Sequence, residues 1–306
     1  MRDIVVVGSL NLDLSFSAER IPAPGETVAA SSLVIGPGGK GLNQAVAASR
    51  LGGRVHMVGR VGSDAFARIP LDTLRDNGVN ATYVAALPDR ATGAAGIVVQ
   101  PDGQNAITVA GGANRALAPD HVRDAVAAFR ASAVLMVQLE APEETVRCAL
   151  ELAKEHGMTT LLDPAPMHAL PDNLLRLVDV LTPNRTEASR LAGTQVCDIE
   201  SAALAGRILH ERSQGDVIVT LAEQGCVWVS TTGFEHVPAP RVEAIDATGA
   251  GDAFNAGLAT ALADEEPLSR ALRRGILSGT ASTLKRGAAE AMPTSEEVVR
   301  LAGERP

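Results

Sequence analysis

The feature that most constrains the fold is a regular alternation of helical and β-type segments in the second part of the chain. From about residue 119, helical patterns such as 142–157 alternate with short apolar runs such as 133–140 and 159–166. Strands separated by helices are typical of a parallel sheet with right-handed crossovers. The sequence therefore predicts an α/β fold, with a doubly wound, mostly parallel central sheet and helices on both faces.

The composition agrees with this fold and excludes several functions. Hydrophobic residues make up 46% of the 306 residues but aromatic residues only 2%, so small aliphatic side chains must build the core. The net charge of −9, without a basic cluster, argues against binding to nucleic acid or to an anionic membrane surface. Cys148, Cys197 and Cys226 are widely spaced, which favours a reducing compartment, and no apolar run is long enough to span a membrane. We expect a soluble, cytoplasmic protein.

Two β-rich excursions interrupt the alternation in the first part of the chain. The first covers about 14–35, with turn signals at Pro22 and Pro24, and the second covers about 92–110. The second contains a Pro-Asp-Gly turn between two apolar runs, which is a hairpin signal. Together the excursions predict a small β-sheet lid over the main sheet. With no interdomain linker in the sequence, we expect a single domain over 1–306.

The stretch DATGAGDAF, residues 246–254, combines a turn of small residues with an acid at the start of a helical pattern. Backbone N–H groups at a helix N-terminus favour an anion there. The carboxylate of Asp252 would repel that anion, so it would be out of place in a turn that only binds anions. Its presence makes sense if it takes a proton from a group that attacks the anion. The alternative is a glycine-rich turn in which an Asp caps a helix.

A second glycine-rich stretch, 36–52, surrounds Lys40. It is not a Walker A loop, because Lys40 is followed by Gly41, and the first strand is not followed by G-x-G-x-x-G. Backbone donors, an ammonium group and the amide of Asn43 suit a polyhydroxylated ligand or a phosphate. The alternative is a simple loop before a helix.

Polar residues at the ends of the predicted strands are candidate site residues, because ligands of such sheets bind beyond the carboxyl ends of the strands. They are Asn11, Asp13, Glu140, Asp163, Asn184 and Thr220. Asn11 and Asp13 point the same way if the backbone stays extended, and together they supply the donors and acceptors that sugar hydroxyls need. They could instead be turn residues.

Eight segments in order resemble the ribokinase family of sugar kinases, also called the phosphofructokinase-B-type carbohydrate kinases. The resemblance runs from residue 4 to about 293 and rests on GSLNLD, PGETV, GGKGLNQAVAASRLG, LMVQLE, DPAP, TPNRTEA, DATGAGDAF and KRGA. It implies ATP-dependent phosphorylation of D-ribose to ribose 5-phosphate. A related kinase of another small sugar, a sugar acid or a nucleoside is the main alternative, although a base pocket usually requires aromatic residues.

The resemblance also implies roles for individual residues. Asp252 matches the catalytic base, and Gly249, Ala250 and Gly251 match the anion hole, which also contacts ATP. The positions that match sugar contacts are Asn11, Asp13, Gly39, Lys40, Asn43, Ala95, Val109 and Glu140, together with Asp252. The positions that match nucleotide contacts are Asn184, Thr220 and Gly225, and Ala222 stands where the family usually has glycine.

Two cations belong to the same implied site. Glu187, with Asn184, matches the position that holds Mg²⁺ near the triphosphate, in part through water. A K⁺ ion is implied beside the anion hole, held mostly by backbone carbonyls at Asp246, Thr248, Ser282, Lys285, Gly287 and Ala291. Ala291 stands where the family typically has a serine, which removes one hydroxyl.

The resemblance gives the lid a function and leaves two further alternatives. In the family the lid covers the sugar, excludes water and often pairs with a second lid, which implies a homodimer. A non-catalytic sugar-binding regulator would be expected to lack the base or the anion hole, and both are present. A dinucleotide oxidoreductase would need the glycine fingerprint that is absent after the first strand.

Overall fold

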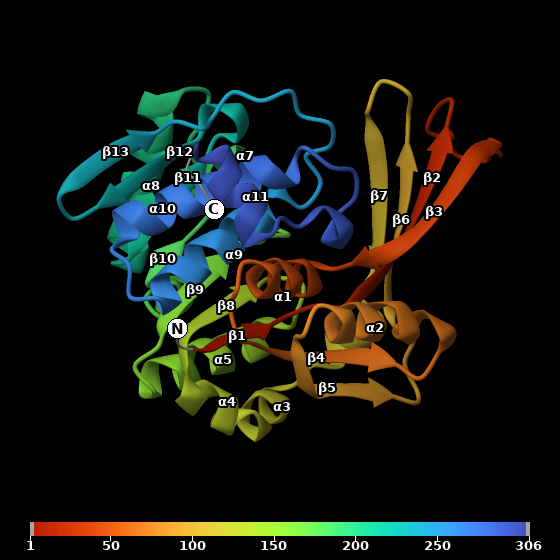
Figure 1. The fold of residues 1–306 in the computed structure, drawn as a ribbon, viewed down its shortest axis with the longest axis horizontal. Helices are drawn as coiled ribbons and strands as arrows, with labels where there is room; N and C mark the ends of the chain where they lie inside the picture. The colour runs from red at the N-terminus through yellow and green to blue at the C-terminus, as the bar shows by residue number, and fades with distance from the viewer. Residues whose placement is uncertain (1–2, 304–306) are drawn as a thin grey trace.

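A computed structural model describes residues 3–303, which form two sheets and the helices around them (Figure 1). The larger sheet has nine strands in the order β13-β12-β11-β10-β9-β8-β1-β4-β5. All neighbours are parallel except β12 and β13, which join the edge in antiparallel fashion. The strands are β1 (Asp3–Val7), β4 (Val55–Gly62), β5 (Asn80–Leu87), β8 (Ser132–Gln138), β9 (Thr159–Asp163), β10 (Val180–Leu181), β11 (Asp216–Thr220), β12 (Cys226–Ser230) and β13 (Gly233–Val237).

Helices cover both faces of this sheet. One face carries α1 (Lys40–Arg50), α2 (Arg68–Asp76), α9 (Ala250–Ala263), α10 (Leu268–Ser282) and α11 (Ser295–Leu301). The other carries α3 (Pro119–Asp124), α4 (Val126–Ala131), α5 (Glu143–Glu155), α6 (Asp172–Leu175), α7 (Arg185–Ala192) and α8 (Ile199–Ser213). Alternate residues of β1 enter the two cores, Val5 and Val7 on one face and Ile4 and Val6 on the other, as the two-residue period of a strand requires.

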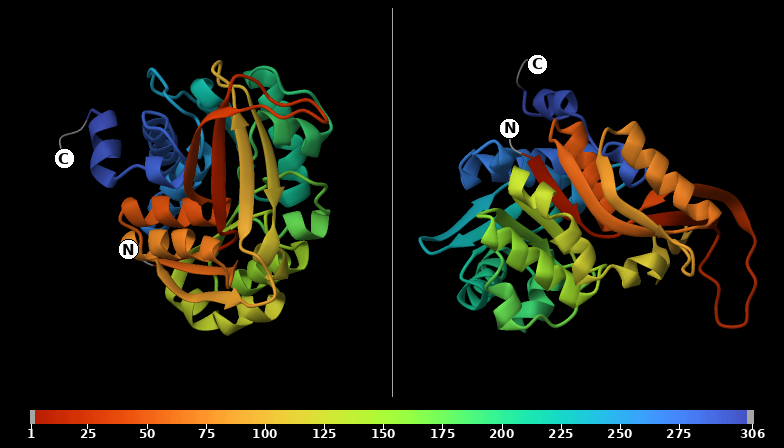
Figure 2. Two further views of the ribbon diagram at one scale, coloured as in Figure 1. Left: turned by 90° about the vertical axis from the view of Figure 1, so that its right-hand side faces the viewer. Right: turned by 90° about the horizontal axis from the view of Figure 1, so that it is seen from below.

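The smaller sheet stands out from the body of the molecule, as Figure 2 shows. Its strand order is β3-β2-β6-β7, with β2 (Asn11–Ala18), β3 (Ala30–Gly38), β6 (Gly93–Val99) and β7 (Asn105–Ala110). We call this sheet the lid. Large apolar residues remain exposed on it, and they are Leu33, Val34, Ile35, Ile107 and Val109.

The predicted fold class is confirmed, and the local differences have simple causes. The helical pattern at 120–131 breaks at Ala125 into α3 and α4. The predicted helix near 64–77 starts with the 3₁₀ turn η1 (Ala65–Ala67). The edge strand β13 was not predicted, because its five residues are partly exposed and carry no apolar alternation. Three more 3₁₀ turns are η2 (Gly112–Ala116), η3 (Ala222–Gln224) and η4 (Ala289–Ala291).

Within residues 3–303, no helix has both the length and the apolar character needed to cross a membrane. All three cysteines carry free thiols, two of them buried.

Candidate active site

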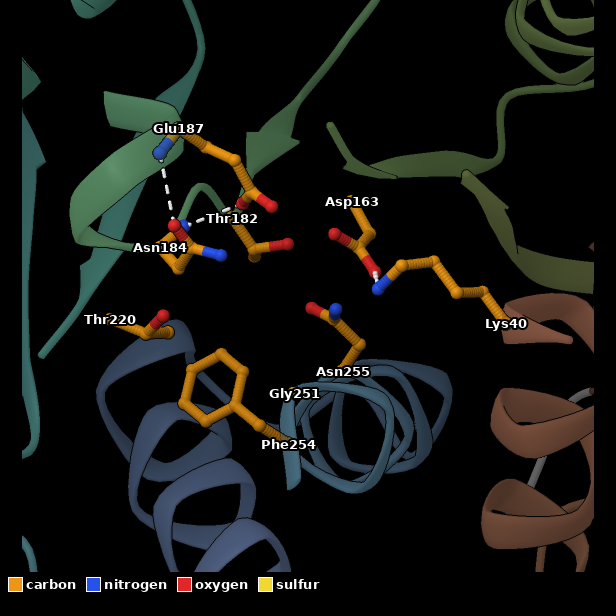
Figure 3. A pocket seen from close by; sticks show the side chains of 9 residues that line it. All are labelled: Lys40, Asp163, Thr182, Asn184, Glu187, Thr220, Gly251, Phe254 and Asn255. Atoms are coloured by element: carbon orange, nitrogen blue, oxygen red, sulfur yellow. Dashed lines mark hydrogen bonds and ion pairs between the residues drawn. The ribbon is translucent and has the colours of Figure 1, made fainter. Parts of the chain in front are cut away.

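The strand ends and the N-termini of α1, α7 and α9 meet at one pocket, which Figure 3 shows from close by. Its lining residues are Lys40, Asp163, Thr182, Asn184, Glu187, Thr220, Gly251, Phe254 and Asn255. Three of the polar strand-end candidates, Asp163, Asn184 and Thr220, therefore come together as the sequence predicts. Thr182, Phe254 and Asn255 line the same pocket but were not among the predicted site residues.

The DATGAGDAF stretch forms the start of α9. Its N-cap is Gly249, with φ +74°, and no side chain caps the helix. Asp252 lies inside the first turn and is 4% exposed, so the alternative in which this acid caps the helix is wrong. The N–H of Ala250 donates to the carbonyl of Ala247 at 3.2 Å, but a Cβ atom added to Gly251 would meet no atom within 4 Å, so the space beside this second residue of the helix is open to a ligand.

Two amide side chains fix the carboxylate of Asp252. Asn43 donates to Oδ2 at 2.9 Å, and Gln44 donates to Oδ1 at 3.1 Å. The same Nε2 of Gln44 lies 3.1 Å from Asp163, while Gln138 donates to the Gln44 oxygen at 2.6 Å. Because both oxygens of Asp252 have a donor, the orientation of this buried carboxylate is set by the protein itself.

Lys40 supplies the positive charge of the site. Its Nζ lies 3.2 Å from Asp163 and 3.9 Å from Asp252, and Figure 3 shows its contact with Asp163. Burial alone would lower the pKa of the ammonium group, but the surrounding carboxylates raise that pKa well above its usual value. They are Asp163, Asp252, Glu140 and Glu187. Burial in turn raises the pKa of Asp163, and Lys40 partly offsets this effect.

The lid strand β2 carries Asn11 and Asp13 on one face, two residues apart, as predicted for an extended segment. A Cβ atom on Gly38 would overlap the Asp13 carboxylate, so this glycine makes room for it. Ala95 pairs with Asp13 and is 5% exposed, while Val109, its neighbour on β7, is 52% exposed. The four positions thus form a strip on one face of the lid.

Asp13 carries a partly buried carboxylate with one unpaired oxygen. Its Oδ1 has no hydrogen-bond partner within residues 3–303. Burial raises its pKa to about 6, and the negative charges of Glu140 and Glu290 add to the effect. A hydrogen bond from a ligand's hydroxyl group would therefore stabilise this carboxylate.

Glu140 links the glycine-rich loop to the end of β1. It accepts hydrogen bonds from the hydroxyl of Ser9 and from the backbone N–H of Lys40, the latter at 3.1 Å. Gly39, with φ +92°, is the N-cap of α1. The stretch predicted as a ligand loop is therefore a very short turn, and Lys40 already belongs to the helix.

The N-x-x-E segment has a structural role that sequence reasoning missed. Asn184 caps α7 by accepting from the backbone N–H groups of Thr186 and Glu187, both at 2.9 Å, and Glu187 accepts from the N–H of Asn184 at 2.8 Å. This is a capping box, whose signal is an Asn followed three residues later by a Glu. It holds both side chains at the pocket, and burial raises the pKa of Glu187.

The two remaining nucleotide candidates lie at the end of β11 and in the turn that follows it. Thr220 forms an isolated bridge to Asn184, which places it at the pocket. Gly225 has φ +87°, and a Cβ atom there would overlap the backbone of Val237. Ala222 has φ +53°, a conformation that costs a side-chain-bearing residue about 1 kcal/mol and explains why glycine is favoured at this position.

The candidate cation loop is held together by Asp246. Its Oδ1 accepts from the backbone and hydroxyl of Thr248 at 2.9 and 2.7 Å, and its Oδ2 accepts from the N–H of Gly287 at 3.0 Å. Although burial opposes it, these bonds lower the pKa of Asp246. The Lys285 ammonium binds Glu297, and the Ser282 hydroxyl bonds within α10. Ala291 is buried in η4.

The doubly wound sheet, the lid and a fixed carboxylate beside an open helix N-terminus define an enzyme that transfers a phosphoryl group to a small molecule. The sequence profile described as "pfkB family carbohydrate kinase" matches residues 1–295. The chain belongs to this family of carbohydrate kinases, and the predicted family is confirmed.

Curated relatives and solved structures agree over nearly the whole chain. A ribokinase of Haemophilus influenzae is 38% identical over 98% of both chains. A deoxyribokinase of Salmonella typhi is 36% identical over 96% of this chain and 97% of its own. The structure of Arabidopsis thaliana ribokinase complexed with ribose and ATP superposes with a TM-score of 0.91, at 32% identity and 98% coverage of both chains.

Proposed function

We propose that this enzyme transfers the γ-phosphoryl group of ATP to D-ribose and forms ribose 5-phosphate. Ribokinases from several organisms are among its relatives at 35–38% identity. The observation that carries the proposal is the carboxylate of Asp252 at the start of α9. It is buried, it is fixed by the side-chain amides of Asn43 and Gln44, and it lies 3.9 Å from the ammonium group of Lys40.

In this proposal the chemistry depends on position and charge. Asp252 takes the proton of the attacking sugar hydroxyl, and the amides at 249–251 stabilise the charge that develops on the phosphoryl group. One such preorganised donor typically contributes about 10²–10³ in rate. Lys40 balances the charge of the neighbouring carboxylates.

The remaining sugar contacts of this proposal come from the lid and from the body of the molecule. The lid contributes Asn11, Asp13, Ala95 and Val109, while the body contributes Gly39, Asn43 and Glu140. ATP would lie along Asn184, Thr220 and Gly225. Closing the lid keeps water away from the activated phosphoryl group, which would otherwise be hydrolysed.

Both implied cations fit the residues present. Mg²⁺ retains several waters and uses one or two carboxylates beside the phosphates, and Glu187 and Asp163 line the pocket there. When bound, it would neutralise phosphate charge. K⁺ would be held by the loop around Asp246 and by the backbone at Thr248, Ser282, Lys285, Gly287 and Ala291, in part through water in place of the missing serine hydroxyl.

The exposed apolar residues of the lid support a homodimer in which two lids pack together. Val34 is 61% exposed and Ile107 is 54% exposed, which is unusual for such side chains in a monomer. We also propose a cytoplasmic location, where ATP is available and a reducing environment keeps cysteines free.

A coupled assay of ADP release tests the proposed function. The panel contains ribose, 2-deoxyribose, fructose, gluconate and adenosine, each with Mg²⁺ and with or without K⁺. We expect the highest kcat/KM for ribose and stimulation by K⁺. 2-Deoxyribose is the second candidate because deoxyribokinases are 36% identical to this chain. A higher kcat/KM for any other member of the panel would refute the assignment of ribose.

A further inference from the structure

The orientation of one buried amide, Asn114, is fixed by the backbone. Asn114 lies in η2, directly after the lid strand β7, and is 2% exposed. The N–H of Leu10 donates to its Oδ1 at 3.0 Å. Because a backbone N–H can only donate, the Nδ2 group of Asn114 must face the other way, toward the carbonyl of Leu10 at 3.3 Å and the side chain of Asn11 at 2.7 Å.

This orientation determines which end of Asn11 is free. The Oδ1 of Asn11 accepts from Asn114, so its Nδ2 group is the end available to a ligand. Asn11 is only 3% exposed, and within residues 3–303 the hydrogen bond of its side chain is the one from Asn114 to its Oδ1. Its neighbour on the same face of β2, Asp13, offers only acceptor oxygens when ionised.

We propose that Asn114 is a positioning residue that makes Asn11 a fixed hydrogen-bond donor to the sugar. Asn11 and Asp13 then form a donor–acceptor pair with a defined direction. This pair selects a sugar with one hydroxyl that donates to Asp13 and an oxygen beside it that accepts from Asn11. The inference rests on the proposed function, because it takes the substrate to be a sugar.

A glycine of the lid makes this contact possible. Gly93 begins β6 and is in register with Asn11. A Cβ atom on Gly93 would overlap both Oδ1 of Asn11 and Nδ2 of Asn114, the two atoms of the hydrogen bond. The adjacent Thr92 is tied to Asp64 by two hydrogen bonds of 2.7 and 2.8 Å. The amide pair therefore lies at a rigid base of the lid.

The substitution Gly93→Ala tests the proposal, with Gly96→Ala as its matched control. Both glycines lie in β6, but a Cβ atom on Gly96 would meet nothing within 4 Å. Neither has a positive φ, so alanine is compatible with both backbones. We expect Gly93→Ala to raise the KM for ribose about ten-fold or more, the size of one lost hydrogen bond, with kcat within about three-fold. Gly96→Ala should leave both constants unchanged.

A second variant, Asn114→Asp, replaces the amide group that donates to Asn11 with a carboxylate oxygen that can only accept a hydrogen bond. One carboxylate oxygen still accepts from Leu10, and the other is an acceptor facing Asn11, so Asn11 must rotate and present its oxygen to the sugar. We expect a higher KM for ribose and a smaller preference for ribose over 2-deoxyribose or arabinose. Added to Asn11→Ala, the substitution should cause no further loss, because both act through one amide.

Three results would overturn the proposal. They are an unchanged KM in Gly93→Ala, an equal effect of Gly96→Ala, or losses that multiply in the double variant. Thermal melting of each variant, with and without ribose, measures folding and sugar binding independently of turnover. The wild-type enzyme in the same assay tests the proposed function separately. If wild type does not phosphorylate ribose, the proposed function is refuted, but the orientation of the Asn114 and Asn11 amides is not. The Gly93–Gly96 comparison is then made with the panel sugar of highest kcat/KM.

Discussion

Replacing Asp13 with Asn should stabilise the free enzyme while it weakens sugar binding. In the free protein this carboxylate is partly buried, its Oδ1 has no hydrogen-bond partner among residues 3–303, and its pKa is raised from 3.8 to about 6. Asn has nearly the same shape and no charge. The substitution therefore removes an unfavourable buried charge without breaking a hydrogen bond to that oxygen.

The magnitude follows from the pKa of Asp13. The difference between about 6 and 3.8 corresponds to about 3 kcal/mol, at roughly 1.36 kcal/mol per pH unit. Because the folded pKa is the higher one, the folded state loses stability as pH rises from 3.8 through 6. Wild type carries the full cost above pH 7, about half of it at pH 5, and almost none below pH 3.8. The gain from Asp13→Asn should follow the same course.

Thermal melting at pH 8 and pH 5 measures this gain. For a chain of 306 residues, about 3 kcal/mol raises Tm by about 5 °C, and the rise should fall to about 2–3 °C at pH 5. Saturating ribose should raise the Tm of wild type much more than that of the variant, since ligand binding adds stability in proportion to ln(1 + [L]/Kd). A variant that melts at or below wild type at pH 8, or a gain independent of pH, would refute the reasoning.

Two further predictions concern the base and the lid. Asp252→Asn should lower kcat by several orders of magnitude while ribose still raises Tm, because the amide cannot accept the proton; near-normal turnover would exclude Asp252 as the base. Val34→Asp should shift the proposed dimer to a monomer in sedimentation velocity, because it places a charge on the exposed apolar part of the lid. The same substitution at Leu204, exposed on α8, should leave the dimer intact. A dimer that persists in Val34→Asp would place the interface elsewhere.

The fold could be predicted because its signal is local and repeated. The alternation after residue 119 sets the sheet, and the i, i+2 spacing of Asn11 and Asp13 places them on one face once β2 is extended. Asp252 was predicted to be the base because a carboxylate beside an anion-binding turn makes sense if it accepts a proton from the group that attacks the anion. Such features depend on residues that are close in the sequence, so they can be recognised from the sequence pattern.

The supporting residues could not be predicted because their partners are far away in the sequence. Gln44 lies in an alanine-rich helix, and its contacts with Asp163 and Asp252 span 119 and 208 positions. Asn114 follows a lid strand and reaches Asn11 across 103 positions. The one local signal that was overlooked is the capping box at Asn184, where the same two residues serve a helix end and the pocket.

In the proposed reaction, Asp252 and Asp13 illustrate how different environments can give one kind of side chain different roles. Asp252 has an amide donor on each oxygen before any ligand arrives, so it keeps one orientation toward the attacking hydroxyl. Asp13 has Oδ1 unpaired and is surrounded by the charges of Glu140 and Glu290, so it is the group that a sugar relieves. The protein thus fixes the proposed base in advance and leaves one oxygen of the proposed sugar-binding carboxylate without a hydrogen bond. In this arrangement ribose gains binding energy from its contact with the lid. The geometry of the proposed proton transfer is set by the protein and does not depend on that contact.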